Sequence, residues 1–166
     1  IGKTPIVVND KRGFYTSRVF TTYIMEGMAM LAEGIHPRSI EVAGLKAGMP
    51  MPPVALQDEV SLSLSLYIAE QTRKDLAAEG VTLPVHPGFA VVQKIGGEKD
   101  RIGKKSGKGF YDYTGKDKAL WPGLLEVYPP KADQPSQQEL VDRLLFAQAN
   151  EAARCFEENV VRSVAD

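Results

Sequence analysis

The sequence predicts an all-α fold preceded by one short strand. Apolar residues recur at helical spacing in residues 18–35 and again in residues 143–161. Residues 54–80 are rich in leucine and in good helix formers. The strand is predicted for residues 6–8, a β-branched run that follows Pro5. A single strand finds no partner within this chain, so helices are expected to form the core.

The first helix follows a connection at residues 9–17 that contains Asn, Asp and Gly, which are typical turn residues. It is predicted over residues 18–35, with apolar residues at Phe20, Ile24, Met28, Leu31 and Ile35. Gly34 supplies the stop signal. Thr16 or Ser17 is expected to cap the start of the helix by accepting a free backbone N–H group.

A second, shorter helix is expected from Pro37 to about Gly48. The prolines of "MPMPP" then predict an extended connection. In residues 54–80 the local signals conflict, because residues 60–66 alternate as a strand would and the remainder favours helix. No turn residue interrupts the stretch, so one continuous helix is predicted.

The last third of the chain is more broken. "FAVVQKIGG" predicts a short helix, and a loop rich in glycine and lysine leads to "GFYDY". "YPPKADQPSQQ" has the proline and polar content of a linker. A final helix is predicted over residues 136–161.

Composition excludes several classes of protein. A formal net charge of −1 over 166 residues argues against nucleic-acid binding driven by phosphate neutralisation. The single cysteine, Cys155, can form no intrachain disulfide, and no Cys/His cluster has the spacing of a zinc site, so no metal is predicted. No apolar run reaches the roughly 18 residues expected of a membrane span.

The final helix repeats the pattern of the first. When residues 143–161 are placed under residues 18–36, at an offset of 125, Arg18 aligns with Arg143, Glu26 with Glu151 and Glu33 with Glu158. Apolar positions agree as well. Two unrelated amphipathic helices can share part of such a pattern, but three charged matches without a gap favour a duplication. The chain is then expected to be a piece of a longer protein, with one full unit and the opening helix of a second.

The chain shows no nucleophilic or nucleotide-binding motif. His36 and His86 each precede a proline, and a turn role explains both better than general-base catalysis does. "RIGKKSGKGF" lacks the spacing of a Walker phosphate loop, and no GxGxxG fingerprint occurs. Any dinucleotide site is therefore expected outside this chain.

Two groups of residues are candidates for binding. Ser17 and Arg18 lie at the start of the first helix, where a hydroxyl could donate to a substrate oxygen or could simply cap the helix. Lys104, Lys105 and Lys108 could pair with the phosphates of a large acylated cofactor, or could form a solvated loop. Glu26 lies two turns further along the helix, where its plainer role is an ion pair on the helix surface or between helices.

Three motifs, "TPIVVNDKRGFYTSR", "GMPMPPVALQDEV" and "GKKSGKGFYDY", together resemble the C-terminal region of L-3-hydroxyacyl-CoA dehydrogenases. The likeness covers the whole chain and preserves motif order. The duplicated unit resembles the large multifunctional enzyme of fatty-acid oxidation, an enoyl-CoA hydratase/3-hydroxyacyl-CoA dehydrogenase. The resemblance implies a helical domain like the C-terminal domain of 6-phosphogluconate dehydrogenase.

The resemblance also implies how the work is divided. NAD would be bound by a Rossmann domain preceding this chain, and residues 1–10 would be the last strand and linker of that domain. Residues 11–133 would form the helical unit, and residues 134–166 the first helix of a truncated second copy. The family's catalytic His-Glu pair, in which His accepts the hydroxyl proton as hydride leaves C3 for NAD, would lie outside the chain. The fragment alone would then be inactive.

The resemblance further implies an acyl-CoA substrate and either a homodimer or a complex with a thiolase. The location would be cytoplasmic in a bacterium, and mitochondrial or peroxisomal in a eukaryote. Ser17 occupies the position where the family commonly has an Asn that contacts the substrate oxygen. Two further departures are Pro52 and Ser61, both at positions where the family usually has Gly. The rival hypothesis, an association module that makes no substrate contact, rests on the apolar stripes of the amphipathic helices.

Overall fold

The structure is a computed structural model that describes residues 2, 5–82 and 84–165. Helices dominate it, so the predicted all-α class is confirmed. The helices are α1 (Thr16–Ala32), α2 (Pro37–Lys46), α3 (Pro53–Val60), α4 (Leu62–Ala78), α5 (Pro87–Val92), α6 (Leu124–Val127) and α7 (Gln137–Glu157). A π-helical turn, η1 (Gln93–Glu98), and a 3-10 turn, η2 (Lys104–Ser106), follow α5. The strands are β1 (Tyr111–Thr114) and β2 (Asp117–Leu120).

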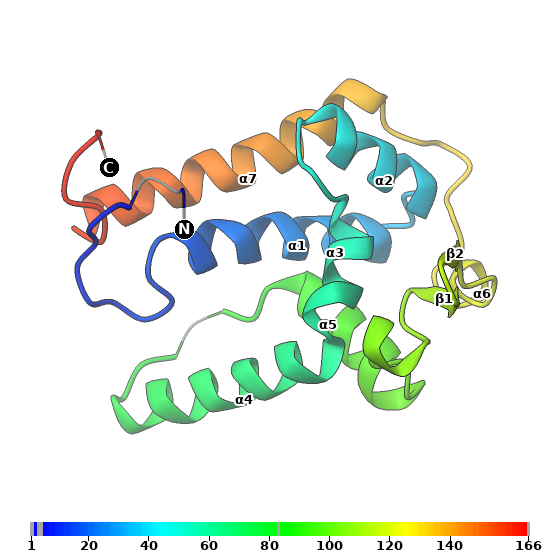
Figure 1. Cartoon of the computed structure of the whole chain (residues 1–166), viewed down its shortest axis with the longest axis horizontal. Helices are drawn as coiled ribbons and strands as arrows, with labels where there is room; N and C mark the ends of the chain where they lie inside the picture. Colours follow the sequence, from blue (N-terminus) through cyan, green and yellow to red (C-terminus); the bar gives the residue numbers. More distant parts are fainter. Residues whose placement is uncertain (1, 3–4, 83, 166) are drawn as a thin grey trace.

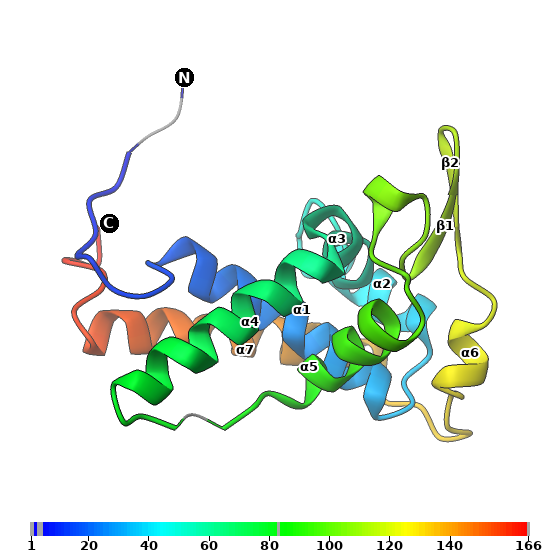
Figure 2. The ribbon, with the colours of Figure 1, turned by 90° about the horizontal axis from the view of Figure 1, so that it is seen from below.

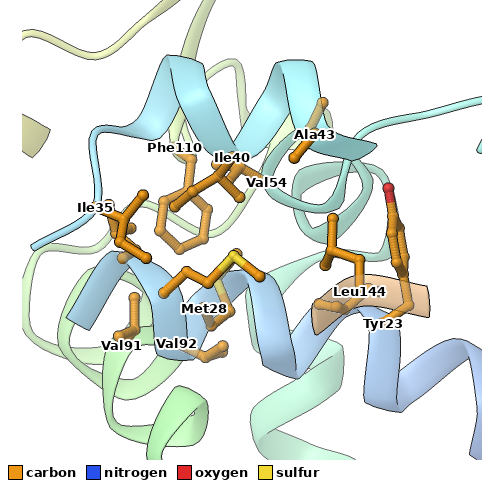
Figure 3. Packing of buried hydrophobic residues seen from close by; sticks show 14 of the residues in the cluster. Tyr23, Met28, Ile35, Ile40, Ala43, Val54, Val91, Val92, Phe110 and Leu144 are labelled. Carbon is orange, nitrogen blue, oxygen red and sulfur yellow. The ribbon is translucent and has the colours of Figure 1, made fainter. Parts of the chain in front are cut away.

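Helix α1 is the central element, because α2, α3, α5 and α7 all pack against it. Helix α7 runs along one side of α1, and α5 lies on the other (Figure 1). Figure 3 shows Met28 of α1 among side chains from α2, α3 and the segment before β1. The buried residues of α1 are Tyr23, Ile24, Gly27, Met28, Ala29, Met30 and Leu31. A helix that is packed from several sides must be apolar or small over most of its surface, and this composition meets that need.

Helices α2 and α5 begin in the same way. Each has proline at its first position, where the missing N–H group costs nothing. In each case the preceding histidine caps the helix through its Nδ1 atom, which accepts an N–H bond of 3.1 Å from Arg38 or from Gly88. The turn role predicted for His36 and His86 is therefore confirmed.

Residues 54–80 do not form one continuous helix, so that prediction is wrong. The chain breaks at Ser61, which has φ +79°, and α4 starts in a new direction. Ser61 lies at a position where the dehydrogenase family that the sequence resembles usually has glycine. Glycine adopts positive φ without steric cost. The serine hydroxyl bonds the carbonyl of Ile102 at 3.1 Å. Serine does not favour positive φ, so Ser61 gave no sign of a break in the sequence.

A second difference is the β-hairpin, which the sequence analysis did not predict. Strands β1 and β2 pair antiparallel with Tyr111 opposite Leu120 and Thr114 opposite Asp117. Two strands alone bury too little surface to be stable in water. The hairpin is stable here because β1 is fastened to the helices, and Figure 2 shows β1 and β2 projecting beyond them.

Residues 6–8 do not form an extended strand within this structure. Val8 makes one isolated antiparallel bridge to Val161, and the N–H of Asn9 bonds the carbonyl of Val160 at 2.9 Å. Ile6 and Val7 are exposed. That this segment completes a sheet elsewhere stays a prediction. Among the described residues, no helix has the length and apolar character needed to cross a membrane.

The backbone at Ser61 generates a stability prediction. Ser61→Gly relieves the positive-φ strain and loses the hydroxyl bond, whereas Ser61→Ala loses the same bond and keeps the strain. The Gly variant should therefore be more stable than the Ala variant by about 1 kcal/mol. Urea unfolding followed by circular dichroism measures the difference. Equal stability, or a more stable Ala variant, would contradict the strain at this position.

Candidate functional site

Ser17 lies in the first turn of α1 and is exposed. It makes no side-chain hydrogen bond with any residue that the structure describes. The predicted capping role is wrong, because the residue before the helix is Tyr15 and no side chain caps this end. The first turn of α1 therefore has no side-chain cap, and Ser17 is exposed within it. Such an arrangement can donate to an oxygen that carries partial negative charge.

Arg18 is held by two carboxylates, one in α7 and one at the residue that follows it. Its Nε atom donates to Glu151 at 2.6 Å, and its Nη1 atom donates to Glu158 at 2.5 Å. These hydrogen bonds, the one to Glu158 above all, outweigh burial and raise the pKa of Arg18 above its ordinary value. The guanidinium is largely neutralised inside the chain, so its clearest effect is to fix the first turn of α1 that carries Ser17.

The three candidate lysines differ in what they contact. Lys104 pairs with Glu59, and Lys108 pairs with Asp100 at 3.2 Å. Within the described part of the chain, Lys105 makes no ion pair. It is exposed on the 3-10 turn η2. Of the three, Lys105 has the side chain most readily available to an external anion.

The structure does not bring Ser17 and the lysines together. The start of α1 lies at the end of the molecule where both termini are found, whereas the segment leading into β1 lies at the opposite side (Figures 1 and 2). A single small ligand therefore cannot touch both groups within this chain. Only an extended ligand could reach from one group to the other.

Sequence reasoning missed a buried carboxylate, Asp58, that organises the hairpin. Its side chain accepts hydrogen bonds from the N–H of Phe110 at 2.8 Å, from the N–H of Tyr111 at 2.9 Å and from the hydroxyl of Tyr113 at 2.9 Å. Gly109 makes this approach possible, since a Cβ atom there would lie 2.0 Å from Asp58 Oδ1. The aromatic residues of "GFYDY" anchor this segment to the core, because Phe110 is fully buried and Tyr111 is buried.

A second buried carboxylate, Glu41 of α2, faces the same hairpin. It accepts a bond from the N–H of Val54 at 2.9 Å and one from the hydroxyl of Tyr111. Burial raises the pKa of Glu41 above its ordinary value, although both hydrogen bonds act in the opposite direction. Burial likewise raises the pKa of Asp58. Hydrogen bonds thus hold each carboxylate in place, while its removal from water disfavours the charged form.

An open groove of about 780 Å³ lies beside Glu41, between α2 and the hairpin. Its lining includes apolar residues together with the cations Arg38 and Lys118. Lys118 Nζ lies 4.7 Å from the centre of the Tyr111 ring, and Arg101 Cζ lies 4.3 Å from the centre of the Trp121 ring. No sequence signal pointed to this groove, because its two walls come from segments far apart in the chain.

The described residues hold no group of three or more His, Cys, Asp or Glu side chains arranged to bind a metal ion. Among the described residues, the buried carboxylates are Asp58, Glu41 and Glu151, and each is occupied by hydrogen bonds or an ion pair. The candidate features for binding are three separate ones: the start of α1, the lysine-bearing turn η2 and the groove beside Glu41.

Comparison with known proteins places this geometry in context. The family model for the C-terminal domain of 3-hydroxyacyl-CoA dehydrogenase matches residues 13–113. Among solved structures, the chain is similar to the dehydrogenase part of multifunctional enzyme 1 from C. elegans, with a TM-score of 0.66 and 23% identity. The match covers 96% of this chain and 36% of that one. At this identity the likeness shows a shared fold, and the chain spans about a third of the C. elegans structure.

The raised pKa of Glu41 generates a pH prediction. A carboxyl whose folded pKa lies above its unfolded value stabilises the fold below the unfolded pKa, and this stability is lost as pH rises through the folded pKa. Glu41→Gln keeps an acceptor for Val54 and cannot ionise. As pH rises from about 4, the unaltered chain should therefore lose stability relative to the Gln variant.

Urea unfolding at a series of pH values measures this difference, with Glu126→Gln on an exposed carboxylate as the matched control. Glu41→Ala leaves the N–H of Val54 and the hydroxyl of Tyr111 without a partner and should cost about 2 kcal/mol. The free energy of unfolding of the Gln variant minus that of the unaltered chain should increase with pH. A difference that stays constant or decreases would contradict the raised pKa of Glu41.

Proposed function

The chain belongs to the 3-hydroxyacyl-CoA dehydrogenase family, whose C-terminal domain it contains, and from that membership we propose that it supplies one wall of an acyl-CoA cleft. The parent enzyme would oxidise a (3S)-3-hydroxyacyl-CoA to a 3-ketoacyl-CoA in fatty-acid β-oxidation. The single observation that carries the proposal is the match over residues 13–113, because that segment contains both candidate binding groups.

The proposal assigns the redox step to residues outside this chain. The sequence contains no glycine-rich fingerprint for a dinucleotide, so the described residues do not fit NAD, and we place its binding in a separate Rossmann domain. Within the chain, His36 and His86 are engaged as helix caps, and neither is proposed as a base. The chain is then inactive by itself and contributes binding and orientation.

Ser17 is the proposed substrate contact. Its hydroxyl is exposed, has no competing hydrogen bond within the described part of the chain, and lies at the positive end of the α1 dipole. A hydroxyl there can donate to the thioester or C3 oxygen of the substrate. Arg18 supports this contact by its ion pairs to α7, which restrict the movement of the first turn.

The lysines of the η2 turn are proposed to contact the phosphates of CoA, with Lys105 foremost because it has no carboxylate partner among the described residues. Lys104 and Lys108 would have to share or release Glu59 and Asp100. An acyl-CoA is an extended molecule with its phosphates remote from the thioester. The separation of Ser17 from the η2 turn is compatible with such a ligand.

We further propose that the parent is a multifunctional enzyme in which residues 1–10 complete the Rossmann sheet, residues 11–133 form the helical unit and residues 134–166 begin a second copy. Its partners would be a second subunit or a thiolase, in the bacterial cytoplasm or in a eukaryotic mitochondrion or peroxisome. The crossed ion pairs between α1 and α7 support the duplicated arrangement.

A second candidate function is an association module that makes no contact with substrate. Helix α4 favours it, because only Leu62 and Leu76 of this helix are buried. The same helix exposes three large apolar side chains, Leu64, Tyr67 and Ile68. Sedimentation combined with an acyl-CoA titration distinguishes the two functions. Self-association without acyl-CoA binding would favour the module.

Ser17 provides the most direct test of the cleft. In a calorimetric titration of the chain with acetoacetyl-CoA, Ser17→Ala should weaken binding by about threefold to tenfold, which is the loss of one hydrogen bond. Ser17→Asn, which restores the family residue, should bind at least as tightly as the unaltered chain. Ser63→Ala on α4 is the control, and equal affinity in all four proteins would exclude Ser17 as a contact.

The division of labour has its own test. The purified chain, mixed with 3-hydroxybutyryl-CoA and NAD, should give no absorbance of NADH at 340 nm, because neither the dinucleotide site nor the base lies within it. Joining the chain to an upstream Rossmann domain of the same family should restore turnover. Reduction of NAD by the chain alone would refute the proposed division.

A further inference from the structure

The groove beside Glu41, which we call the α2–hairpin groove, has no part in the proposed acyl-CoA contacts. Ser17 and the three candidate lysines lie outside its lining. One wall is the start of α2, and the other is β2 together with the segment that runs into α6. Its volume of about 780 Å³ lies within the range of roughly 300–1,000 Å³ that is typical of sites for small molecules. The groove is therefore a separate feature, and its lining indicates which class of ligand it fits.

Part of the lining is apolar and incompletely buried. Val42 on the α2 wall is 43% exposed, and Leu125 on the opposite wall is 41% exposed. Trp121 adds an indole ring that is half-buried. Exposed apolar surface of this kind is stabilised when an apolar body covers it and displaces water. The groove thus favours a ligand with an apolar part that can lie against both walls.

The same lining carries two cations, one on each wall. Arg38 belongs to the first turn of α2, and Lys118 belongs to β2. Both are exposed, and neither forms an ion pair with any carboxylate that the structure describes. The exposed residues Asp117 and Glu126 are close in sequence to the groove but lie outside its lining. Lys118 Nζ is held against the groove wall by the Tyr111 ring, whose centre is 4.7 Å away. A cation on each wall attracts an anionic group.

His36 adds a donor at the start of α2. Its Nδ1 atom accepts the N–H bond of Arg38 at 3.1 Å, so in the neutral imidazole the hydrogen is on Nε2, which can donate. His36 also precedes the first turn of α2, where the helix dipole is positive. The donor and the dipole both favour negative charge in the part of the groove that contains Arg38.

Glu41 is the one carboxyl group in the described lining, and it does not cancel these charges. Its Oε1 atom accepts the N–H bond of Val54 at 2.9 Å, and its Oε2 atom accepts a bond from the hydroxyl of Tyr111. Burial raises the pKa of Glu41, and the nearby charge of Lys118 lowers it by less. The charged form of Glu41 is therefore disfavoured. The groove accordingly presents a positive surface to a ligand.

We propose that the α2–hairpin groove binds a small amphiphile with an anionic head and an apolar body, of the class to which decanoate belongs. Arg38 and Lys118 would bind the head, and Trp121 and Leu125 would cover the apolar body. A guanidinium group suits this task because its fork of N–H donors matches the two oxygens of a carboxylate. The proposal goes beyond the acyl-CoA contacts, since it requires neither Ser17 nor the lysines near η2.

Trp121 makes the groove directly observable, because it is the only tryptophan in the sequence. Addition of decanoate to the full chain, below the concentration at which micelles form, should cause a saturable shift of the Trp121 emission to shorter wavelength. Decyltrimethylammonium has the same alkyl chain with the opposite charge, and acetate has the head without the chain. Each should bind at least about tenfold more weakly than decanoate, because each lacks one of the two contacts.

Charge reversal tests the two cations. Arg38→Glu and Lys118→Glu should each weaken the binding of decanoate about tenfold, since each replaces an attraction by a repulsion. The chain with both substitutions should bind decyltrimethylammonium in preference to decanoate. Lys46→Glu is the matched control, because Lys46 is an exposed cation of α2 that lies outside the lining. It changes the net charge equally and should leave the affinity for decanoate within about twofold.

Arg38 and Lys118 are exposed, so their substitution should leave the helical circular dichroism of the chain unchanged. A Trp121 emission that does not respond to decanoate would overturn the proposal. Equal binding of decanoate, decyltrimethylammonium and acetate would contradict it too, as would an affinity for decanoate that is indifferent to both charge reversals.

The acyl-CoA contacts are tested separately. The affinity for acetoacetyl-CoA, measured by calorimetry, should be the same in the chain with Arg38→Glu and Lys118→Glu as in the unaltered chain. Conversely, Ser17→Ala should leave the affinity for decanoate unchanged. Competition between decanoate and acetoacetyl-CoA would show that the groove belongs to the acyl-CoA cleft, and the assignment of a separate site would then be wrong.

Discussion

The burial of helix α1 is the constraint on which the remainder of the fold depends. Helices from both ends of the sequence pack against it, and its apolar side chains form the middle of the main core. A helix in this position can carry charge only where a partner neutralises it. Arg18, Glu26 and Glu33 meet that condition because α7 supplies the opposite charges. The start of α1, where the substrate contact is proposed, is thereby fixed by the same contact that fills the core.

Local patterns were sufficient to predict most of the helical framework. The apolar spacing of residues 18–35, with Gly34 as the stop signal, identified α1, and Pro37 identified the first residue of α2. The break at Ser61 was not predictable in this way, because serine carries no preference for positive φ. Its conformation is imposed by the surroundings, where the Ser61 hydroxyl and the N–H of Leu62 both bond the carbonyl of Ile102.

The candidate site was predictable only in part, for a related reason. Ser17 and the lysines were found because each lies in a short motif. The Asp58 and Glu41 carboxylates were missed, because their partners Phe110 and Tyr111 lie more than fifty residues away in the sequence. Glutamate or aspartate on a predicted helix is ordinarily an exposed residue, and nothing nearby in the chain marks these two as buried. The hairpin depends on them, so it was missed as well.

The charged and the apolar residues of the α1–α7 contact correspond to different degrees. Three charged residues are identical in the aligned helices, at Arg18 and Arg143, Glu26 and Glu151, and Glu33 and Glu158. Many apolar residues differ, with Val19 aligned to Leu144, Met30 to Cys155 and Tyr15 to Leu140. In a dimer of identical subunits, one mutation alters both ends of such a contact at once. Within a single polypeptide each end can drift alone, so a larger side chain gained at one position can be balanced by a smaller one elsewhere. In the proposed duplication, the apolar packing of each end could thus change independently, while the shared ion pairs kept the two helices in the same arrangement.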